Sequence, residues 1–176
     1  MRFGILSVSR SKGYRWFMTD YLVTYQLSRG RFASEVEGLN QEQLNWKPYP
    51  AALSIGEMAL HVAGVELWFT AQIKGESLSG EAERLAKTAT EGVVNENPFP
   101  YSAEEITPEL VAEALTMGRS AAEELIALPS DTYQTELQSA LGPVIKANGA
   151  LARMTFHPGY HHGQAYQIKM DPRFPA

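Results

Sequence analysis

Hydrophobic residues recur every three to four positions in four stretches of the chain, a period that predicts α-helices. The first helix is expected from about residue 14 or 17 to residue 39. Its apolar face reads Met18, Leu22, Tyr25, Phe32 and Val36. No stretch gives a convincing prediction of a β-sheet. The pattern therefore predicts an all-α fold, a four-helix bundle of up-down type with one long crossing connection.

The second helix has the clearest start signal in the sequence. Ser54 is a favoured N-cap, and Glu57 three residues later completes a capping box. Leu53 and Met58 occupy the positions of a hydrophobic staple. The helix is expected to end near residues 74–75, where a glycine follows a lysine. Its apolar face reads Met58, His61, Val65, Trp68 and Gln72.

The connector 40–54 precedes this second helix. Pro48 and Pro50 predict that it is irregular. Its aromatic residues, Trp46 and Tyr49, are expected to lie on the core rather than to form a binding site.

The polar stretch 76–102 follows the second helix. It is expected to be irregular apart from one short helix at about 81–87. It should serve as a crossing loop, or as a lid formed by residues 76–104.

Two further helices complete the bundle. The third is expected to start at Thr107 and Pro108 and to be closed by Pro129. Its inner face reads Val111, Ala114, Leu115, Gly118, Ala122 and Leu125. The fourth is expected from an Asn148 cap to about Met170. Its inner face reads Ala150, Met154, His157, His161, Gln164 and Ile168.

Length and charge narrow the class of protein. The 176 residues fit a single domain, residues 1–176. A net charge of -5 argues against nucleic acid as a partner, and the basic residues Arg10, Lys12 and Arg15 are interpreted as solvated surface. No apolar run approaches the roughly 20 residues of a membrane span, and no secretory leader is recognisable, so a cytoplasmic protein without a membrane partner is expected.

The chain contains no cysteine, which excludes disulfides, thiolate ligands and a cysteine nucleophile. A metal ion in this protein would therefore need histidine, carboxylate or water ligands.

The histidines form the candidate site. His157 and His161 are one helical turn apart and project from the same face, and His61 lies on the inner face of another helix. Three imidazoles would hold a divalent metal ion and leave a position for water or substrate, as catalytic sites do. The residues alone leave open the alternative that these are hydrogen-bonded core histidines without a metal.

The neighbours of the two helical histidines complicate this interpretation. Pro158 predicts either a kink or a new helical segment that starts there. His162 is rotated by about 100° from His161 and is not counted as a ligand. Gln164 shares the face of His161 and could orient a metal-bound water or bond to the backbone.

Two histidine motifs together resemble the DinB family, the DinB/YfiT-like superfamily of metalloenzymes. The fragment HPGYHHGQ, residues 157–164, is similar to the family's late-helix signature. The fragment SIGEMALHVAGVELWF, residues 54–69, resembles its second-helix motif with one histidine. Residues 39–50 also resemble the family's connector.

The resemblance implies a four-helix bundle with a metal site formed by His61, His157 and His161, zinc or nickel being the expected ions, and a homodimer. Some relatives are transferases that use small thiols of the bacillithiol, mycothiol or glutathione type, and others resemble a thiol-dependent isomerase. No catalytic residue is assigned by the resemblance.

The leading functional hypothesis is a metal-dependent thiol transferase that acts on a small-molecule substrate. A metal-dependent hydrolase is the alternative, but it needs a general base. Glu66 should point away from the ring of His61, and Glu57 is expected to be committed to the helix cap. A metal-binding stress-response protein without turnover is the third hypothesis.

Overall fold

The computed structural model describes residues 14–139 and 144–176, with side chains described from residue 21 onward except at residue 130. The helices are α1 (Tyr14–Val36), α2 (Gln41–Asn45), α3 (Ile55–Lys74), α4 (Gly80–Lys87), α5 (Pro108–Ile126) and α6 (Ala147–Lys169). A 3-10 helix, η1 (Ser130–Gln134), precedes two strands, β1 (Glu136–Gln138) and β2 (Val144–Lys146).

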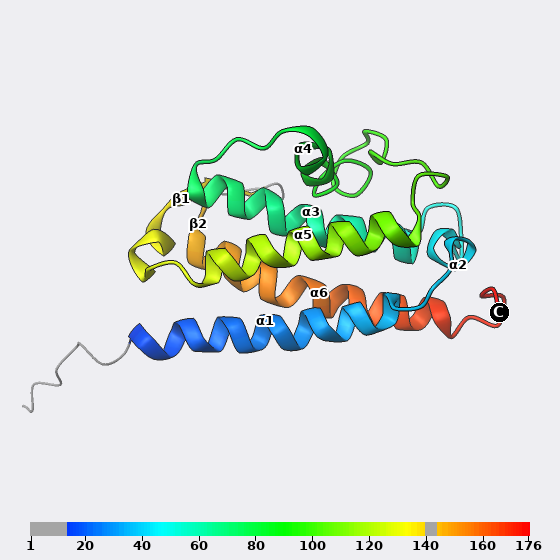
Figure 1. The fold of residues 1–176 in the computed structure, drawn as a ribbon, viewed down its shortest axis with the longest axis horizontal. Coiled ribbons are helices and arrows are strands. Elements are labelled where there is room, and N and C mark those ends of the chain that lie inside the picture. The colour runs from blue at the N-terminus through cyan, green and yellow to red at the C-terminus, as the bar shows by residue number, and fades with distance from the viewer. Residues whose placement is uncertain (1–13, 140–143) are drawn as a thin grey trace, which may run out of the picture.

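The four long helices α1, α3, α5 and α6 form a bundle (Figure 1). Helices α1 and α6 pack against each other and run in one direction, while α3 and α5 pack against each other and run in the other. The parallel pair α3 and α5 requires the long connection that carries α4 across the bundle. The predicted all-α bundle with one long crossing connection is therefore confirmed.

Helix α3 begins and ends where the sequence predicts. The Ser54 hydroxyl accepts from the Glu57 amide at 3.1 Å, and the Glu57 carboxylate accepts from the Ser54 amide at 2.8 Å. Gly75 ends the helix with a φ of 68°, a conformation that favours glycine. Most residues of α3 are buried, as expected for a helix enclosed by α4, α5 and α6.

The inner faces of the other helices agree with the prediction in most positions. In α1, Tyr25, Phe32 and Val36 are buried. Small residues on α5, among them Gly118 and Ala122, let it approach α3 closely. The side chains of Met18 and of the basic residues at positions 10, 12 and 15 lie outside the part of the chain that the structure describes.

The structure contains one small sheet, for which the sequence shows no convincing pattern. Strands β1 and β2 form an antiparallel hairpin in which Leu137 pairs with Ile145. Three residues in each strand are too few for an alternating pattern to be recognised. The hairpin also changes the start of α6: its N-cap is Lys146 rather than Asn148, and the Ala147 amide donates to the Thr135 carbonyl at 2.8 Å.

The connector before α3 differs from the prediction in two respects. It contains the short helix α2, which Asn40 and Gln43 start with a capping box. Tyr49 is 62% exposed and does not lie on the core. Trp46 does pack on the core, and its ring meets that of Phe174 edge to face at 5.6 Å.

Pro158 lies inside α6, which continues through it as one helix. The predicted alternative of a new segment that starts at Pro158 was therefore wrong. The short helix α4 and the Thr107 cap of α5 are confirmed. In the described part of the chain, no helix has the length and apolar character needed to cross a membrane.

Candidate metal centre

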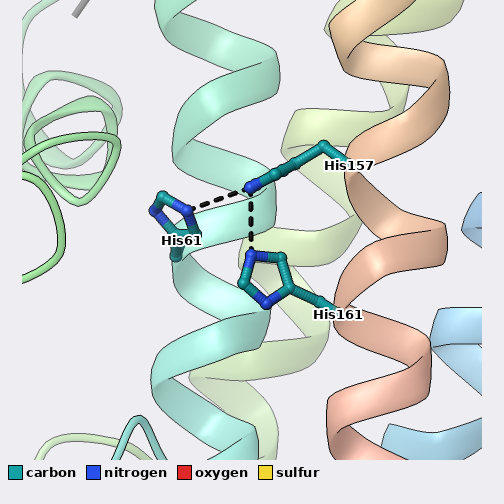
Figure 2. Close-up of side chains that lie close together, drawn as sticks. All are labelled: His61, His157 and His161. Carbon is teal, nitrogen blue, oxygen red and sulfur yellow. Dashed lines mark hydrogen bonds between the residues drawn. The ribbon is translucent and has the colours of Figure 1, made fainter. Parts of the chain in front are cut away.

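The three histidines singled out in the sequence come together between α3 and α6 (Figure 2). The Nε2 atom of His157 lies 3.0 Å from Nε2 of His61 and 3.0 Å from Nε2 of His161. His61 and His161 are buried and His157 is half-buried. Three ring nitrogens from two helices thus converge on one point.

The tautomer of His61 is set by the connection after α4. Its Nδ1 atom lies 2.7 Å from the backbone carbonyl oxygen of Thr88. Because a carbonyl can only accept, Nδ1 carries the hydrogen and Nε2 presents a lone pair to the other two rings. Metal-binding histidines commonly have such a partner on the nitrogen that faces away from the ion.

Thr88 is itself held in place by contacts with α3 and α4. Its hydroxyl lies 2.9 Å from the Leu60 carbonyl and 2.6 Å from the Leu85 carbonyl. Gly64 makes this approach possible, since a Cβ atom there would overlap with the Thr88 hydroxyl and the Leu85 carbonyl. A glycine on α3 therefore sets how closely the partner of His61 can lie.

The site keeps its histidines neutral. Burial, together with the neighbouring rings of His161 and His61, lowers the pKa of His157 to about 2. Burial and the His61 ring lower the pKa of His161 to about 3. The pKa of His61 is also lowered by burial, although the bond to Thr88 opposes the shift. Neutral imidazole is the form that binds metal ions.

The donor set fits a metal ion. A neutral ring nitrogen carries either a hydrogen or a lone pair, so His157 Nε2 cannot donate to one neighbour and accept from the other. Three lone pairs directed at one point are satisfied together by a cation. Two nitrogens bound at about 2.1 Å to one ion lie about 3.0–3.4 Å apart, close to the 3.0 Å that separates Nε2 of His157 from Nε2 of each of the other two rings.

A large cavity opens beside the triad. Its volume is about 1140 Å³, enough for a small molecule and a second reactant. The walls are mainly apolar and come from the α2–α3 connector, α3, the segment after α4, and α6. The residues that line it beyond the triad include Tyr49, Trp68, Phe69, Val93, Arg153 and Phe156.

No aspartate or glutamate lines this cavity among the described residues. Glu66 lies on another side of α3, where its Oε1 accepts from Tyr25 Oη and Arg29 Nε, both at 2.8 Å. Burial raises the pKa of the Glu66 carboxyl group, and Arg29 opposes the shift. Glu57 caps α3 and pairs with Lys47. Neither carboxylate reaches the triad.

His162 and Gln164 are placed differently from the triad. The ring of His162 turns outward and lies 3.4 Å from a Glu35 oxygen, so its exclusion from the site agrees with the structure. Gln164 donates to the Tyr160 hydroxyl at 3.2 Å, a partner that neither sequence alternative anticipated. Its Oε1 atom and Nδ1 of His161 are buried without a hydrogen-bond partner among the described residues.

Sequence reasoning missed three features of the site and its surroundings. No local sequence pattern marks Thr88, because it contacts His61 through its backbone carbonyl, which every residue has. Arg153 could have been noticed, since it precedes His157 by one helical turn on the same face. The ion pair of Arg29 and Glu66 joins two separate helices, which spacing within one helix cannot reveal.

The family model of the DinB superfamily matches residues 24–165, which include all three histidines, the whole of α3 and α5, and α1 and α6 apart from the start of α1 and the end of α6. A search of curated proteins found no match. The match extends over most of the chain and includes the signature fragments around His61 and His157. The chain belongs to the DinB superfamily.

Proposed function

We propose that this protein is a metal-dependent thiol transferase, in which His61, His157 and His161 hold one divalent ion. The observation that carries the proposal is the convergence of three neutral imidazoles on the wall of an apolar cavity that no described carboxylate lines. Zinc and nickel are the expected ions, because both accept imidazole ligands.

A divalent ion bound by the triad would supply a Lewis acid that favours the thiolate form of a coordinated thiol. The protein's own residues prepare the place for this chemistry. Thr88 holds the ring of His61 in the tautomer that exposes Nε2. Apolar side chains such as Trp68 and Phe69 would exclude water from the reacting groups.

The transfer itself is a substitution that needs no oxidant or reductant. The thiolate sulfur forms a bond with an electrophilic carbon, and the leaving group departs with the electron pair of the bond that breaks. The thiol proton passes to solvent. The thiol is expected to be of the bacillithiol, mycothiol or glutathione type, as the family resemblance implies, and a homodimer is the expected assembly.

A metal-dependent hydrolase remains the second candidate. It would use the same histidines but would need a general base near the ion. The described carboxylates closest in sequence to His61 are committed elsewhere, Glu57 to a helix cap and Glu66 to Arg29. A metal-binding protein without turnover is the third candidate, but a large open cavity beside the ligands is typical of a catalytic site rather than a sealed structural one.

The first test is elemental analysis of the untagged protein together with three single variants. About one equivalent of metal is expected in the wild type and in His162→Ala, whose ring lies outside the triad. The His61→Ala and His157→Ala variants should lose the metal. Metal retained by both of these variants would contradict the proposed ligand set.

The second test measures activity of the loaded protein with glutathione and 1-chloro-2,4-dinitrobenzene, with chloride release as the readout. Turnover should depend on both the metal and the thiol. If ester hydrolysis by the loaded protein requires no thiol, while thiol transfer is absent across a panel of thiols and electrophiles, the hydrolase candidate replaces the transferase.

A further inference from the structure

Arg153 is the one charged side chain among the described residues that line the cavity. It stands on α6 one turn before His157, so about 6 Å of helix rise separates the two residues. Arg153 is half-buried, and its Nη1 donates to the hydroxyl of Ser139, the residue after β1. A guanidinium has five N–H donors, so most of its hydrogen-bonding capacity is not used by this contact.

Among the described residues, none that lines the cavity or pairs with a cation balances the charge of Arg153. Among the described residues, ion pairs form at Arg29, Lys47, Lys74, Arg84, Lys87, Arg119, His162, Lys169 and Arg173, but not at Arg153. No described lining residue of the cavity is acidic. The described lining of the cavity therefore carries one unbalanced positive charge beside neutral histidines, and a divalent ion would add to it.

The walls strengthen the effect of this charge. Trp68, Phe69 and Phe156 are among the apolar side chains that share the cavity with Arg153. Charges act over longer distances when water is replaced by apolar groups. Guanidinium groups in such settings typically bind carboxylates through two parallel hydrogen bonds.

We propose that Arg153 binds a carboxylate group of the small molecule that occupies this cavity. The carboxylate is expected on the thiol, because one helical turn between Arg153 and His157 lies within the length of one small molecule. This inference rests on the proposed function for the identity of the thiol, but the binding of an anion by Arg153 does not. The expected substrate class is therefore thiols that carry a negatively charged group.

A purely structural role is the competing explanation. The bond between Arg153 and Ser139 connects α6 to the hairpin, and its loss could destabilise the fold. Such a role would affect thermal stability without changing which ligands bind. Discrimination between a charged ligand and its neutral counterpart therefore separates the two explanations.

The test compares 3-mercaptopropionate with 3-mercaptopropionamide, titrated calorimetrically into metal-loaded protein. The wild type is expected to bind the carboxylate at least tenfold more tightly. Arg153→Gln should lose most of this preference and bind the amide as the wild type does, and Arg153→Lys should retain part of it. Differences in thiol acidity cancel, because each protein is titrated with the same two ligands.

Arg31→Gln is the matched control, since it removes the same charge from an exposed position of α1 outside the cavity. It should keep the full preference. Equal affinity of the wild type for both thiols, or a preference that persists in Arg153→Gln, would overturn the proposal.

The S-methyl ethers of both ligands distinguish this inference from the proposed function. They retain the carboxylate or amide but cannot form a thiolate. A preference for the carboxylate ether that Arg153→Gln abolishes supports the anion site even if free thiols bind no better than ethers, in which case the thiol proposal fails alone. In another outcome, the wild type distinguishes the two thiols but not the two ethers, and Arg153→Gln abolishes the preference between the thiols. That result would assign the carboxylate to the thiol specifically.

Discussion

The Nδ1 atom of His61 lies 2.7 Å from the carbonyl oxygen of Thr88, in the segment that follows α4. This contact decides which nitrogen of His61 faces the other two histidines. It depends on the Thr88 hydroxyl, which bonds to carbonyls of both α3 and α4 and so holds the backbone carbonyl in position. The crossing connection therefore acts on the metal centre through one main-chain atom.

Removal of that hydroxyl should weaken metal binding. Thr88→Val keeps the shape of the side chain but removes the hydroxyl's hydrogen bond to the Leu60 and Leu85 carbonyls, so we expect a loss of about 1–2 kcal/mol in stability. Metal affinity should fall by about tenfold, as is usual when a partner of a metal ligand is disturbed. Competition with a chromophoric chelator measures the affinity. Thr88→Ser, which keeps a hydroxyl, should stay close to the wild type, and equal affinities of both variants would contradict the role of the hydroxyl.

Two glycines should respond in opposite ways to alanine. At Gly64 a Cβ atom would overlap with Thr88 and Leu85, so Gly64→Ala should destabilise the fold by about 1–3 kcal/mol. At Gly30, within α1, no atom lies within 4 Å of such a Cβ, so Gly30→Ala should stabilise by about 0.5–1 kcal/mol. Urea unfolding of both variants measures the difference. A neutral effect of Gly64→Ala would mean that the close approach of α4 is not required.

Substitution of only one partner of the buried pair of Arg29 and Glu66 should strongly destabilise the fold. Arg29→Met leaves the Glu66 carboxylate buried without its cation, and we expect a loss of about 3–5 kcal/mol in stability. The double variant with Glu66→Met should lose less than the two single variants combined. Arg119→Met, which breaks the exposed pair with Glu123, should cost no more than about 0.5 kcal/mol. Additive losses at Arg29 and Glu66 in chemical unfolding would contradict their coupling.

The metal-free protein should lose stability in acid because of the triad. The folded pKa values of His157 and His161 are about 2 and about 3, below the ordinary value of 6.5. At pH values between the folded and the ordinary pKa of these rings, the unfolded chain binds more protons than the folded protein. Stability therefore falls as the pH falls below about 6.5. Relative to pH 8, each of the two rings should cost about 2 kcal/mol at pH 5.

Urea unfolding at several pH values measures this dependence. His157→Gln and His161→Gln should each reduce it, while His162→Gln, a histidine outside the triad, is the matched control. A wild-type stability that stays level from pH 8 to pH 5 would contradict the buried, neutral state of the triad.

Several elements could be predicted from local sequence because their determinants are local. The capping box of Ser54 and Glu57 and the Pro108 start of α5 involve residues within one helical turn. The shared face of His157 and His161 follows from helical geometry alone. The strands β1 and β2 escaped prediction because three residues carry too short a pattern.

The sequence by itself determined the four long helices, their apolar faces and, through two motifs that resemble the DinB family, which three histidines belong together. Only the tertiary structure decided that Thr88 orients His61, that Glu66 is held by Arg29, and that Arg153 shares a cavity with the triad. The physical reason is that these relationships join residues far apart in the chain. Periodicity reports which face of a helix is buried, but packing decides which atoms that face meets.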